Sequence, residues 1–368
     1  MMLILETGRD DLLKPLQAVT GIVERKHTLP ILSNILLQSE NGQVQLLATD
    51  LEIQIHTLGA QGAQPDFRIT TNAKKLQDIL RALPDSSTVQ LDLADHKLTL
   101  KAGKSRFNLQ TLPAQDFPTM NVDENTSAAF ALPQETLKHM ISQVQHSMAV
   151  QDIRFYLNGL LMQTEGNQLR LVATDGHRLA FTSATLETEL PKHDVILPRK
   201  TVLELNKLLT QPKENVVVEL LDNQVRFRCN DTVIVSKVID GRFPDYNRVI
   251  PMDNKNIFVI DRLSLLGALE RSSILANEKF RGVRLLVQPG SLHITCTNNE
   301  QEEASEELDI AYQGESLDVG FNITFLLDLL RNVHSDEVQL AFGSADRATL
   351  FTVPNRPEFK YVVMPMRI

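Results

Sequence analysis

The feature that most constrains the fold is a unit of about 125 residues that occurs three times along the 368-residue chain. The string Leu47-Ala48-Thr49-Asp50 returns as Val172-Ala173-Thr174-Asp175, 125 residues later, and a third version ends Thr295-Cys296-Thr297-Asn298. Each version follows a Gly or Asn turn and an alternating apolar segment, which is the pattern of a β-hairpin. Self-similarity at a fixed period indicates duplication, so the three units should share one fold.

Two helices are expected in each repeat. The first has an apolar stripe at helical spacing. The second carries an acid followed three residues later by a base, a pair that in isolation would be an exposed contact worth roughly a few tenths of a kcal/mol. Its recurrence at a nearly constant period favours duplication instead. The stripes are Leu12, Leu13, Leu16 and Val19, then Leu137, Met140, Ile141 and Val144, then a fainter Leu265, Leu266 and Leu269; the pairs are Asp78 with Arg81, Glu204 with Lys207, and Asp328 with Arg331.

With two helices among roughly eight strands, each repeat is expected to be α+β, its helices packed on one face of antiparallel sheets. Polar loops near residues 123–127 and 251–254 suit linkers between repeats. The sequence therefore predicts three domains, at residues 1–125, 126–252 and 253–368.

Composition is that of a soluble globular protein, with 42% hydrophobic and 23% charged residues. Two cysteines, Cys229 and Cys296, are too few for a disulfide framework and are expected to be buried, reduced thiols. The first residues lack the basic flank of a signal peptide, and no run approaches the roughly 20 apolar residues of a membrane helix. We therefore expect a cytoplasmic protein that has no membrane partner.

Charge is segregated along the chain. Five acids fall within residues 300–307, whereas Lys101, Lys104 and Arg106 cluster in the first repeat. Either cluster alone would be an ordinary solvated surface. Opposite clusters on the two terminal repeats favour a head-to-tail contact between subunits, and such heterologous contacts close into a ring when the rotation closes.

The net charge of −9 argues against nucleic acid only if the charge is evenly spread. The remaining Lys and Arg residues concentrate on the expected helices and their approaches. Two chains would supply twelve helices, which at roughly 9 Å between axes form a circle about 35 Å across. Subtracting a helix diameter of about 10 Å leaves a bore of roughly 25 Å. Such a lining would contact duplex DNA without sequence preference.

Five strings carry a family resemblance: TLPIL at 28–32, TDGHRLA at 174–180, DGRFPDY at 240–246, NEKFRGV at 277–283 and YVVMPMR at 361–367. In this order and spacing the chain resembles the beta subunits of bacterial DNA polymerase III, the sliding clamps, over essentially its whole length. The resemblance implies a non-enzymatic processivity factor of DNA replication that forms a ring-shaped head-to-tail homodimer of six similar domains around DNA. It implies no cofactor and no metal.

The resemblance further implies a pocket between the second and third domains. That pocket would receive short peptides, typically a Gln followed by apolar residues, from replicative and other DNA polymerases, a clamp loader and repair proteins. Leu, Val, Pro and Met suit an adaptable apolar slot. Without the resemblance, the C-terminal segment would be interpreted as a final edge strand. The implied pocket residues are Leu157, Thr174, Gly176, His177, Arg178, Leu179, Pro244, Arg248, Val249, Val362, Val363, Met364, Pro365, Met366 and Arg367.

Two further sets follow from the resemblance. Ser305 stands where the family often has Glu, and Phe155 where it often has Tyr, so one ion pair and one hydroxyl contact are in doubt. The implied subunit contact has Phe107, Leu109, Ile274 and Leu275 at its centre, with Lys75, Lys104 and Arg106 facing Glu300, Glu302, Glu303 and Glu306; the implied DNA-binding residues are Lys26, Gln151, Arg154, Phe155, Tyr156, Arg199 and Lys200.

The alternative is an enzyme, for example a hydrolase that uses Asp175 and His177. Asp50 occupies the matching place in the first repeat without a following His, so the Asp is better explained as turn chemistry. Gly103-Lys104-Ser105 resembles the end of a phosphate-binding loop, but Leu98 stands where the first Gly is required. We therefore expect no catalytic residues.

Overall fold

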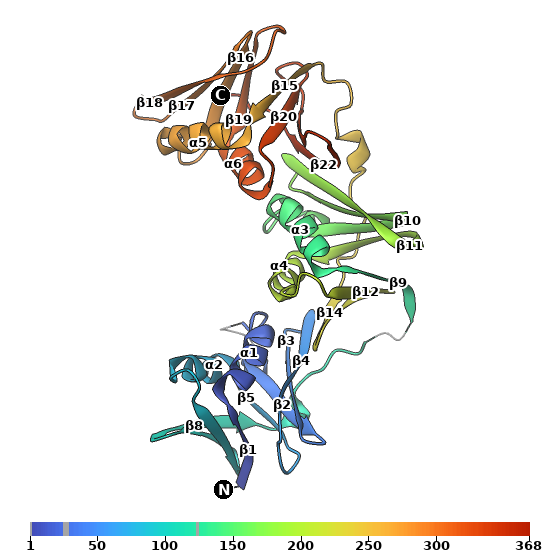
Figure 1. The fold of residues 1–368 in the computed structure, drawn as a ribbon, viewed down its shortest axis with the longest axis vertical. Helices are drawn as coiled ribbons and strands as arrows, with labels where there is room; N and C mark the ends of the chain where they lie inside the picture. Colours follow the sequence, from blue (N-terminus) through green and yellow to red (C-terminus); the bar gives the residue numbers. More distant parts are fainter. Residues whose placement is uncertain (1, 25–28, 123–124) are drawn as a thin grey trace. The chain divides into compact units, whose positions relative to one another are not determined.

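The computed structural model describes residues 2–24, 29–122 and 125–368. The chain divides into two compact units, which are described one at a time: Met1–Glu135 with Leu203–Val238, and Thr136–Val202 with Ile239–Ile368. Figure 1 shows the helices and strands of each unit. The helices are α1 Arg9–Thr20, α2 Ala73–Ala82, α3 Gln134–Val144, α4 Arg199–Leu208, α5 Arg262–Ser272 and α6 Ile323–Asn332.

The first unit contains one 12-stranded sheet, in the order β1-β6-β7-β8-β5-β2-β3-β4-β14-β13-β12-β9. Its paired strands are antiparallel, as β3 with β4 and β4 with β14 illustrate. Its strands are β1 Met2–Gly8, β2 Asn34–Glu40, β3 Gln43–Thr49, β4 Ile53–Gln61, β5 Arg68–Asn72, β6 Thr88–Ala94, β7 Lys97–Ala102, β8 Ser105–Leu112, β9 Thr126–Pro133, β12 Asn215–Leu221, β13 Gln224–Cys229 and β14 Thr232–Lys237.

The second unit contains a six-stranded sheet, β10-β11-β22-β21-β20-β15, and a four-stranded sheet, β18-β17-β16-β19. Two strands are long, β10 with 16 residues and β11 with 21. The strands are β10 Gly159–Thr174, β11 Arg178–Pro198, β15 Asn256–Asp261, β16 Gly282–Gln288, β17 Ser291–Thr297, β18 Glu303–Asp309, β19 Leu317–Asn322, β20 Glu337–Phe342, β21 Thr349–Val353 and β22 Arg356–Val363.

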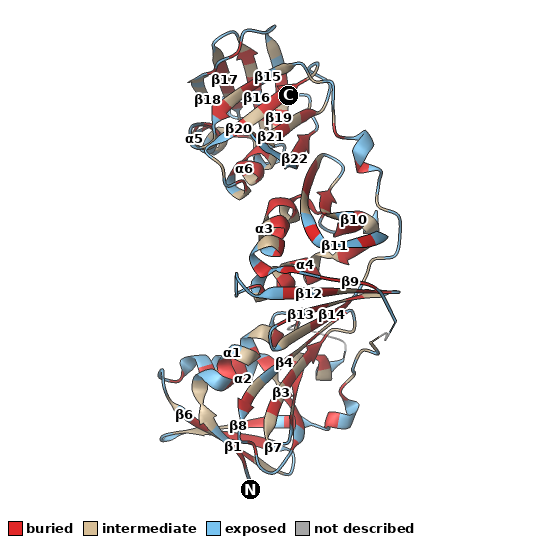
Figure 2. Ribbon diagram, turned by 45° about the vertical axis from the view of Figure 1, so that its right-hand side comes forward, coloured by how far each residue is buried: buried red, intermediate tan, exposed pale blue. Residues whose placement is uncertain are grey.

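The core forms where apolar positions of helices and strands coincide. Alternate residues of β3 and β4 are buried, as expected when one face of a strand packs on the core (Figure 2). The predicted stripes of α1 and α3 are buried, and in α5 Leu265 and Leu269 are buried while Leu266 is half-buried. Asn72 and Asn322 cap α2 and α6 by accepting a backbone N–H. The α+β architecture and the helix repeats are confirmed.

Sheets continue from one repeat into the next. Strand β4 of the first repeat pairs with β14 of the second, and β11 of the second pairs with β22 of the third. Because these sheets extend across two repeats, the compact units do not coincide with the three expected domains. The boundaries predicted near residues 125 and 252 lie in segments that connect β8 to β9 and β14 to β15, and these boundaries stay a prediction.

The acid–base pairs of the second helices differ from one repeat to the next. Glu204 pairs with Lys207 at 2.7 Å, the i,i+3 contact that the spacing allows. Asp78 instead pairs with Lys74 at 3.4 Å, and Asp328 pairs with Arg178 at 2.6 Å. The duplicated positions have therefore acquired different partners.

Both cysteines are buried and free. Burial raises the pKa of the Cys229 thiol to about 12 and that of Cys296 to about 11, so neither is a reactive thiolate. Across residues 2–24, 29–122 and 125–368, no helix has the length and apolar character needed to cross a membrane.

Candidate partner-binding pocket

The turn at residues 174–178, which joins β10 to β11, is held by side-chain hydrogen bonds. Asp175 Oδ1 accepts from the backbone N–H groups of His177 and Arg178 at 2.9 and 3.0 Å. Thr174 Oγ1 donates to the Arg178 carbonyl at 2.7 Å. An Asp that accepts two backbone donors in this way stabilises a tight turn, which is the role that the sequence predicted for Asp175.

The same hydrogen bonds recur in the other two repeats. Asp50 Oδ1 accepts from Glu52 N and Ile53 N at 2.9 and 2.8 Å. Asn298 Oδ1 accepts from Glu300 N and Glu302 N at 2.9 and 3.0 Å, in a turn that is one residue longer. The duplication inferred from the sequence therefore extends to individual hydrogen bonds.

A catalytic pairing of Asp175 with His177 has no support in this geometry. Asp175 Oδ2 forms an ion pair with Arg178 at 3.0 Å, and Oδ1 is occupied by the turn. The His177 side chain is exposed. In the part of the chain that the structure describes, no group of His, Cys, Asp and Glu side chains could hold a metal ion.

A cavity of about 220 Å³ lies beside this turn. It combines residues of β10, β11 and β22 with the segment at 243–249, so residues far apart in the sequence share one lining. Nine of the fifteen residues implied for the pocket meet there. They are Leu157, Thr174, Gly176, Arg178, Leu179, Pro244, Val249, Val362 and Met364, joined by Arg154, Tyr156, Phe243 and Tyr246.

Four lining residues were not assigned to the pocket from the sequence. Phe243 and Tyr246 lie in the string DGRFPDY, which signalled the family but not the position of each side chain. Arg154 and Tyr156 were assigned to DNA binding, and the structure places them at the cavity. A sequence string cannot show which surface of a loop faces a distant strand.

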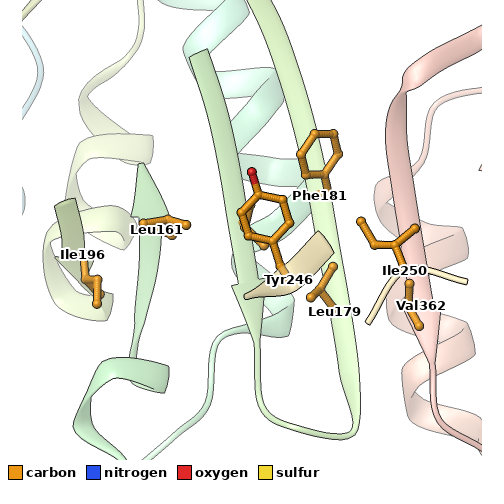
Figure 3. Packing of buried hydrophobic residues seen from close by; sticks show 8 residues of the cluster. Leu161, Leu179, Phe181, Ile196, Tyr246, Ile250 and Val362 are labelled. Atoms are coloured by element: carbon orange, nitrogen blue, oxygen red, sulfur yellow. The ribbon is translucent and has the colours of Figure 1, made fainter. Parts of the chain in front are cut away.

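The floor of the cavity is a packed apolar cluster. It contains Leu179, Tyr246 and Val362, and Figure 3 shows their side chains converging from β11, β22 and the segment at 246–250. The Tyr246 hydroxyl donates to Gln163 Oε1 at 2.7 Å, and its ring lies 5.7 Å from that of Phe181. A buried Tyr whose hydroxyl is satisfied fixes its ring, so the floor is preorganised.

The other implied pocket residues lie outside this lining. Arg248 is exposed and pairs with Asp245 at 3.0 Å. Val363 is fully buried within its sheet. Met366 N donates to the Gly320 carbonyl at 2.8 Å, so the last residues follow β19. The residues placed outside the cavity lining are His177, Arg248, Val363, Pro365, Met366 and Arg367.

Gly176 shapes the rim of the cavity. Its φ is +91°, and a Cβ placed on it would lie 3.2 Å from both terminal nitrogens of Arg154. Asp152 fixes Arg154 by accepting from its Nε at 3.0 Å and its Nη2 at 2.8 Å. These hydrogen bonds hold the pKa of Asp152 at about 2. Glycine adopts this backbone conformation most readily, and a larger residue here would have to shift the Arg154 guanidinium.

The residues assigned to DNA binding lie in two places. Gln151, Arg154, Phe155 and Tyr156 share one loop, in which Phe155 is 73% exposed. Arg199 and Lys200 begin α4 and are half-buried. Burial lowers the pKa of Arg199, and the nearby Arg178 lowers it further. Lys26 lies outside the described residues.

The residues assigned to a subunit contact occupy two strand edges and their neighbours. Arg106, Phe107 and Leu109 lie on β8, with Lys104 in the preceding turn and Lys75 on α2. In the other unit, Ile274 is 78% exposed beside the half-buried Leu275. Glu300, Glu302, Glu303 and Glu306 lie on β18 or in the turn before it.

Comparison with known proteins shows the family. The chain matches the models of the DNA polymerase III beta subunit N-terminal domain at residues 1–121, central domain at 131–245 and C-terminal domain at 247–367. It is 43% identical over 364 residues to the beta sliding clamp of Pseudomonas putida and 42% identical over 362 residues to that of Escherichia coli, with 98% of each chain covered.

Solved structures agree with this assignment. The crystal structure of the Pseudomonas aeruginosa sliding clamp bound to griselimycin matches with a TM-score of 0.94 at 41% identity, covering 100% of both chains. The Caulobacter crescentus beta sliding clamp matches with a TM-score of 0.95 at 38% identity, covering 100% of this chain and 99% of that one. The chain therefore belongs to the family of bacterial DNA polymerase III beta subunits, the beta sliding clamps.

Proposed function

We propose that two copies of this chain join head to tail into a ring around duplex DNA, and that the ring tethers polymerases through the cavity beside the turn at 174–178. As a beta sliding clamp, the protein is a non-catalytic processivity factor of DNA replication. Beyond this family function, we propose the ring assembly, the roles of individual residues and a location in the cytoplasm, where bacterial DNA is replicated.

The main observation in favour of a ring-shaped dimer is a pattern of strand pairing. The strand after each recurring turn pairs with the last hairpin strand of the following repeat: β4 with β14, and β11 with β22. The third such strand is β18, and the remaining last hairpin strand is β8. Among the described residues, β18 pairs only with β17, and residues 105–110 of β8 pair only with β7.

A second copy of the chain would complete this pattern. Strand β18 of one copy would pair with β8 of the other, which repeats the two junctions inside each chain. Exposed strand edges readily pair with another chain, and here one edge carries Lys104 and Arg106 while the other carries Glu303 and Glu306. Opposite charges favour this pairing and disfavour pairing of like edges.

The second helices of the repeats support the same contact. Phe325, three residues after the cap of α6, stacks on Arg178 at 4.5 Å beside the turn at 174–178. Lys75 lies three residues after the corresponding cap of α2. By this correspondence, Lys75 of one copy would lie beside the acidic turn that contains Glu300 and Glu302 of the other. Glu306 already pairs with Arg271 at 2.7 Å, so its carboxylate would be shared.

Contact with DNA is proposed to be independent of sequence. Arg199, Lys200 and Lys26 would meet phosphates through screened interactions, and Gln151 and Phe155 would add contacts from an exposed loop. Tethering raises the local concentration of a polymerase at its template, which increases processivity without catalysis. Peptide segments with a Gln followed by apolar residues fit the cavity chemistry, because Leu179, Val362 and Met364 offer an apolar slot.

The assembly is tested by combining light scattering with DNA retention. The wild-type protein should have twice the chain mass of 41.4 kDa, remain on nicked circular DNA and slide off linear DNA. Replacing Ile274 and Leu275 with Asp should give monomers that are not retained on circles, because the apolar centre of the contact is lost. Met252→Asp is the matched control, since Met252 is 83% exposed and lies outside the proposed contact. A wild-type monomer, or equal retention on circles and linear DNA, would overturn the proposal.

A further inference from the structure

Arg178 lines the cavity, but its guanidinium is bound by the protein itself. Nε donates to Asp175 Oδ2 at 3.0 Å, Nη1 to Asp328 Oδ2 at 2.6 Å and Nη2 to the His146 carbonyl at 2.5 Å. Its face stacks on the Phe325 ring at 4.5 Å. Because all three nitrogens are engaged, Arg178 is better placed to brace the cavity wall than to bind a peptide.

The partners of Arg178 lie in a mostly buried environment. Only 10% of the Arg178 side chain and 28% of the Asp328 side chain are exposed. Burial acts to lower the pKa of Arg178, but Tyr361, Asp328 and Asp175 outweigh it and the pKa is raised. Removing one partner from a buried charge is strongly unfavourable, because the remaining charge has lost its compensation. The position of Arg178 therefore depends on Asp328.

Arg178 is also part of the backbone that forms the cavity. Its N–H and carbonyl hold the turn through Asp175 and Thr174, and it pairs with Val363 at the start of the β11–β22 ladder. The Tyr361 hydroxyl on β22 donates to the Phe325 carbonyl of α6 at 3.1 Å. Helix α6 is thus attached to β11 and β22, two of the strands whose side chains line the cavity, although Asp328 itself does not line it.

We propose that Asp328 is a positioning residue of the partner-binding pocket: from α6 it fixes Arg178, and through Arg178 the turn and strand that carry Thr174 and Leu179. This inference rests on the proposed function of the pocket. The corresponding acids of α4 and α2, Glu204 and Asp78, each pair with a lysine of their own helix. Among the ion pairs of the described residues, Asp328 therefore differs from both in pairing with an arginine of a turn.

The expected consequence concerns peptide affinity. Without Asp328, Arg178 loses one of its two carboxylate partners and the turn samples other positions. The apparent affinity for a ligand falls in proportion to the fraction of molecules whose site is competent. We expect Asp328→Asn to weaken peptide binding about tenfold, which corresponds to a competent fraction of about one tenth.

The experiment measures binding of fluorescein-labelled Gln-Leu-Val-Leu-Phe to the full chain by anisotropy at 25 °C. Glu270→Gln is the matched control: it breaks the exposed Arg331–Glu270 pair, 2.9 Å, between α5 and the same helix, and should leave the affinity unchanged. In an Arg178→Met background, Asp328→Asn should weaken peptide binding further by less than about twofold, because a residue that acts through Arg178 has no further effect on affinity once Arg178 is gone.

Each outcome decides the matter. Unchanged affinity in Asp328→Asn, equal losses in Asp328→Asn and Glu270→Gln, or a full tenfold effect in the Arg178→Met background would overturn the proposal. If Asp328→Asn does not fold, Asp328→Glu replaces it; this variant keeps the charge on a longer side chain and should weaken binding about threefold, and no change would count against the proposal. Absence of peptide binding by the wild-type chain would instead overturn the proposed function of the pocket itself.

Discussion

The junction between β4 and β14 and the junction between β11 and β22 share one backbone plan and differ in their side chains. Both begin with a Thr and an Asp that hold a tight turn by equivalent hydrogen bonds. The first then continues Leu51-Glu52-Ile53, and the second Gly176-His177-Arg178. Duplication thus preserved the turn, and a few substitutions made one copy into a candidate binding site.

The helices at the two junctions differ in the same way. At the first, Gly21 leaves room for the Glu204 carboxylate, which would lie 1.9 Å from a Cβ at that position. At the second, His146 occupies the matching place, and its carbonyl accepts from Arg178. Gly21 beside the Glu204 carboxylate at the first junction thus corresponds to the His146 ring beside Arg178 at the second. Three predictions test how much these differences matter.

The largest effect is expected from removing the turn acid at each junction. Asp175→Ala should lower the free energy of unfolding by about 3 to 4 kcal/mol, because it removes the carboxylate that accepts from two backbone N–H groups and is one partner of the buried Arg178 charge. Asp50→Ala should cost about 1 to 2 kcal/mol, because it removes the acceptor of two backbone N–H groups, and Ile53 of that turn has no guanidinium to be left uncompensated as Arg178 would be. Urea unfolding of both variants checks this difference, and equal losses would show that the ion pair adds nothing.

The second prediction concerns pH and His146. Burial, with the nearby Arg178, lowers the pKa of His146 from 6.5 to about 4. Between pH 6.5 and 4 the unfolded chain therefore binds a proton at His146 that the folded chain excludes. The contribution of neutral His146 to the free energy of unfolding is complete above pH 6.5 and is lost as the pH falls towards 4. The loss is up to about 3 kcal/mol.

Replacing His146 with Phe, a ring of similar size, should flatten the pH dependence of the unfolding midpoint in this window. All other titrating groups are common to both proteins, so the difference between the two profiles isolates His146. Parallel profiles for the wild-type protein and the variant would contradict the assignment.

The third prediction concerns the residue with positive φ in each turn, Gly176 in the second repeat and Leu51 in the first; each is replaced by the other's residue type. Gly176→Leu should weaken peptide binding about 50-fold, or about 2.3 kcal/mol, because the new side chain displaces Arg154 and enters the cavity. The turn should still form, since Leu51 adopts a φ of +77° in the first repeat. Leu51→Gly is the reciprocal control and should leave peptide affinity unchanged. Retention of full affinity in Gly176→Leu would place the peptide elsewhere.

Much of the fold could be predicted from the sequence because its signals are local and repeated. The apolar stripes of α1 and α3 follow helical periodicity, and the turn acids are recognisable from their residue type and their recurrence. The candidate cavity was only partly predictable. Phe243 and Tyr246 line the cavity because their loop packs across β11 and β22. Met366 lies outside the lining because the chain turns towards Gly320. Such placements depend on contacts between distant segments.

The sequence by itself determined the threefold repeat, the α+β class and the family, because periodicity, turn chemistry and motif order are properties of local residue patterns. Only the tertiary structure decided which partner each duplicated residue acquired. Asp328, Glu204 and Asp78 occupy matching positions in the sequence, yet they pair with Arg178, Lys207 and Lys74 respectively. An ion pair depends on which charges packing brings within a few ångströms, and spacing along one helix cannot specify that.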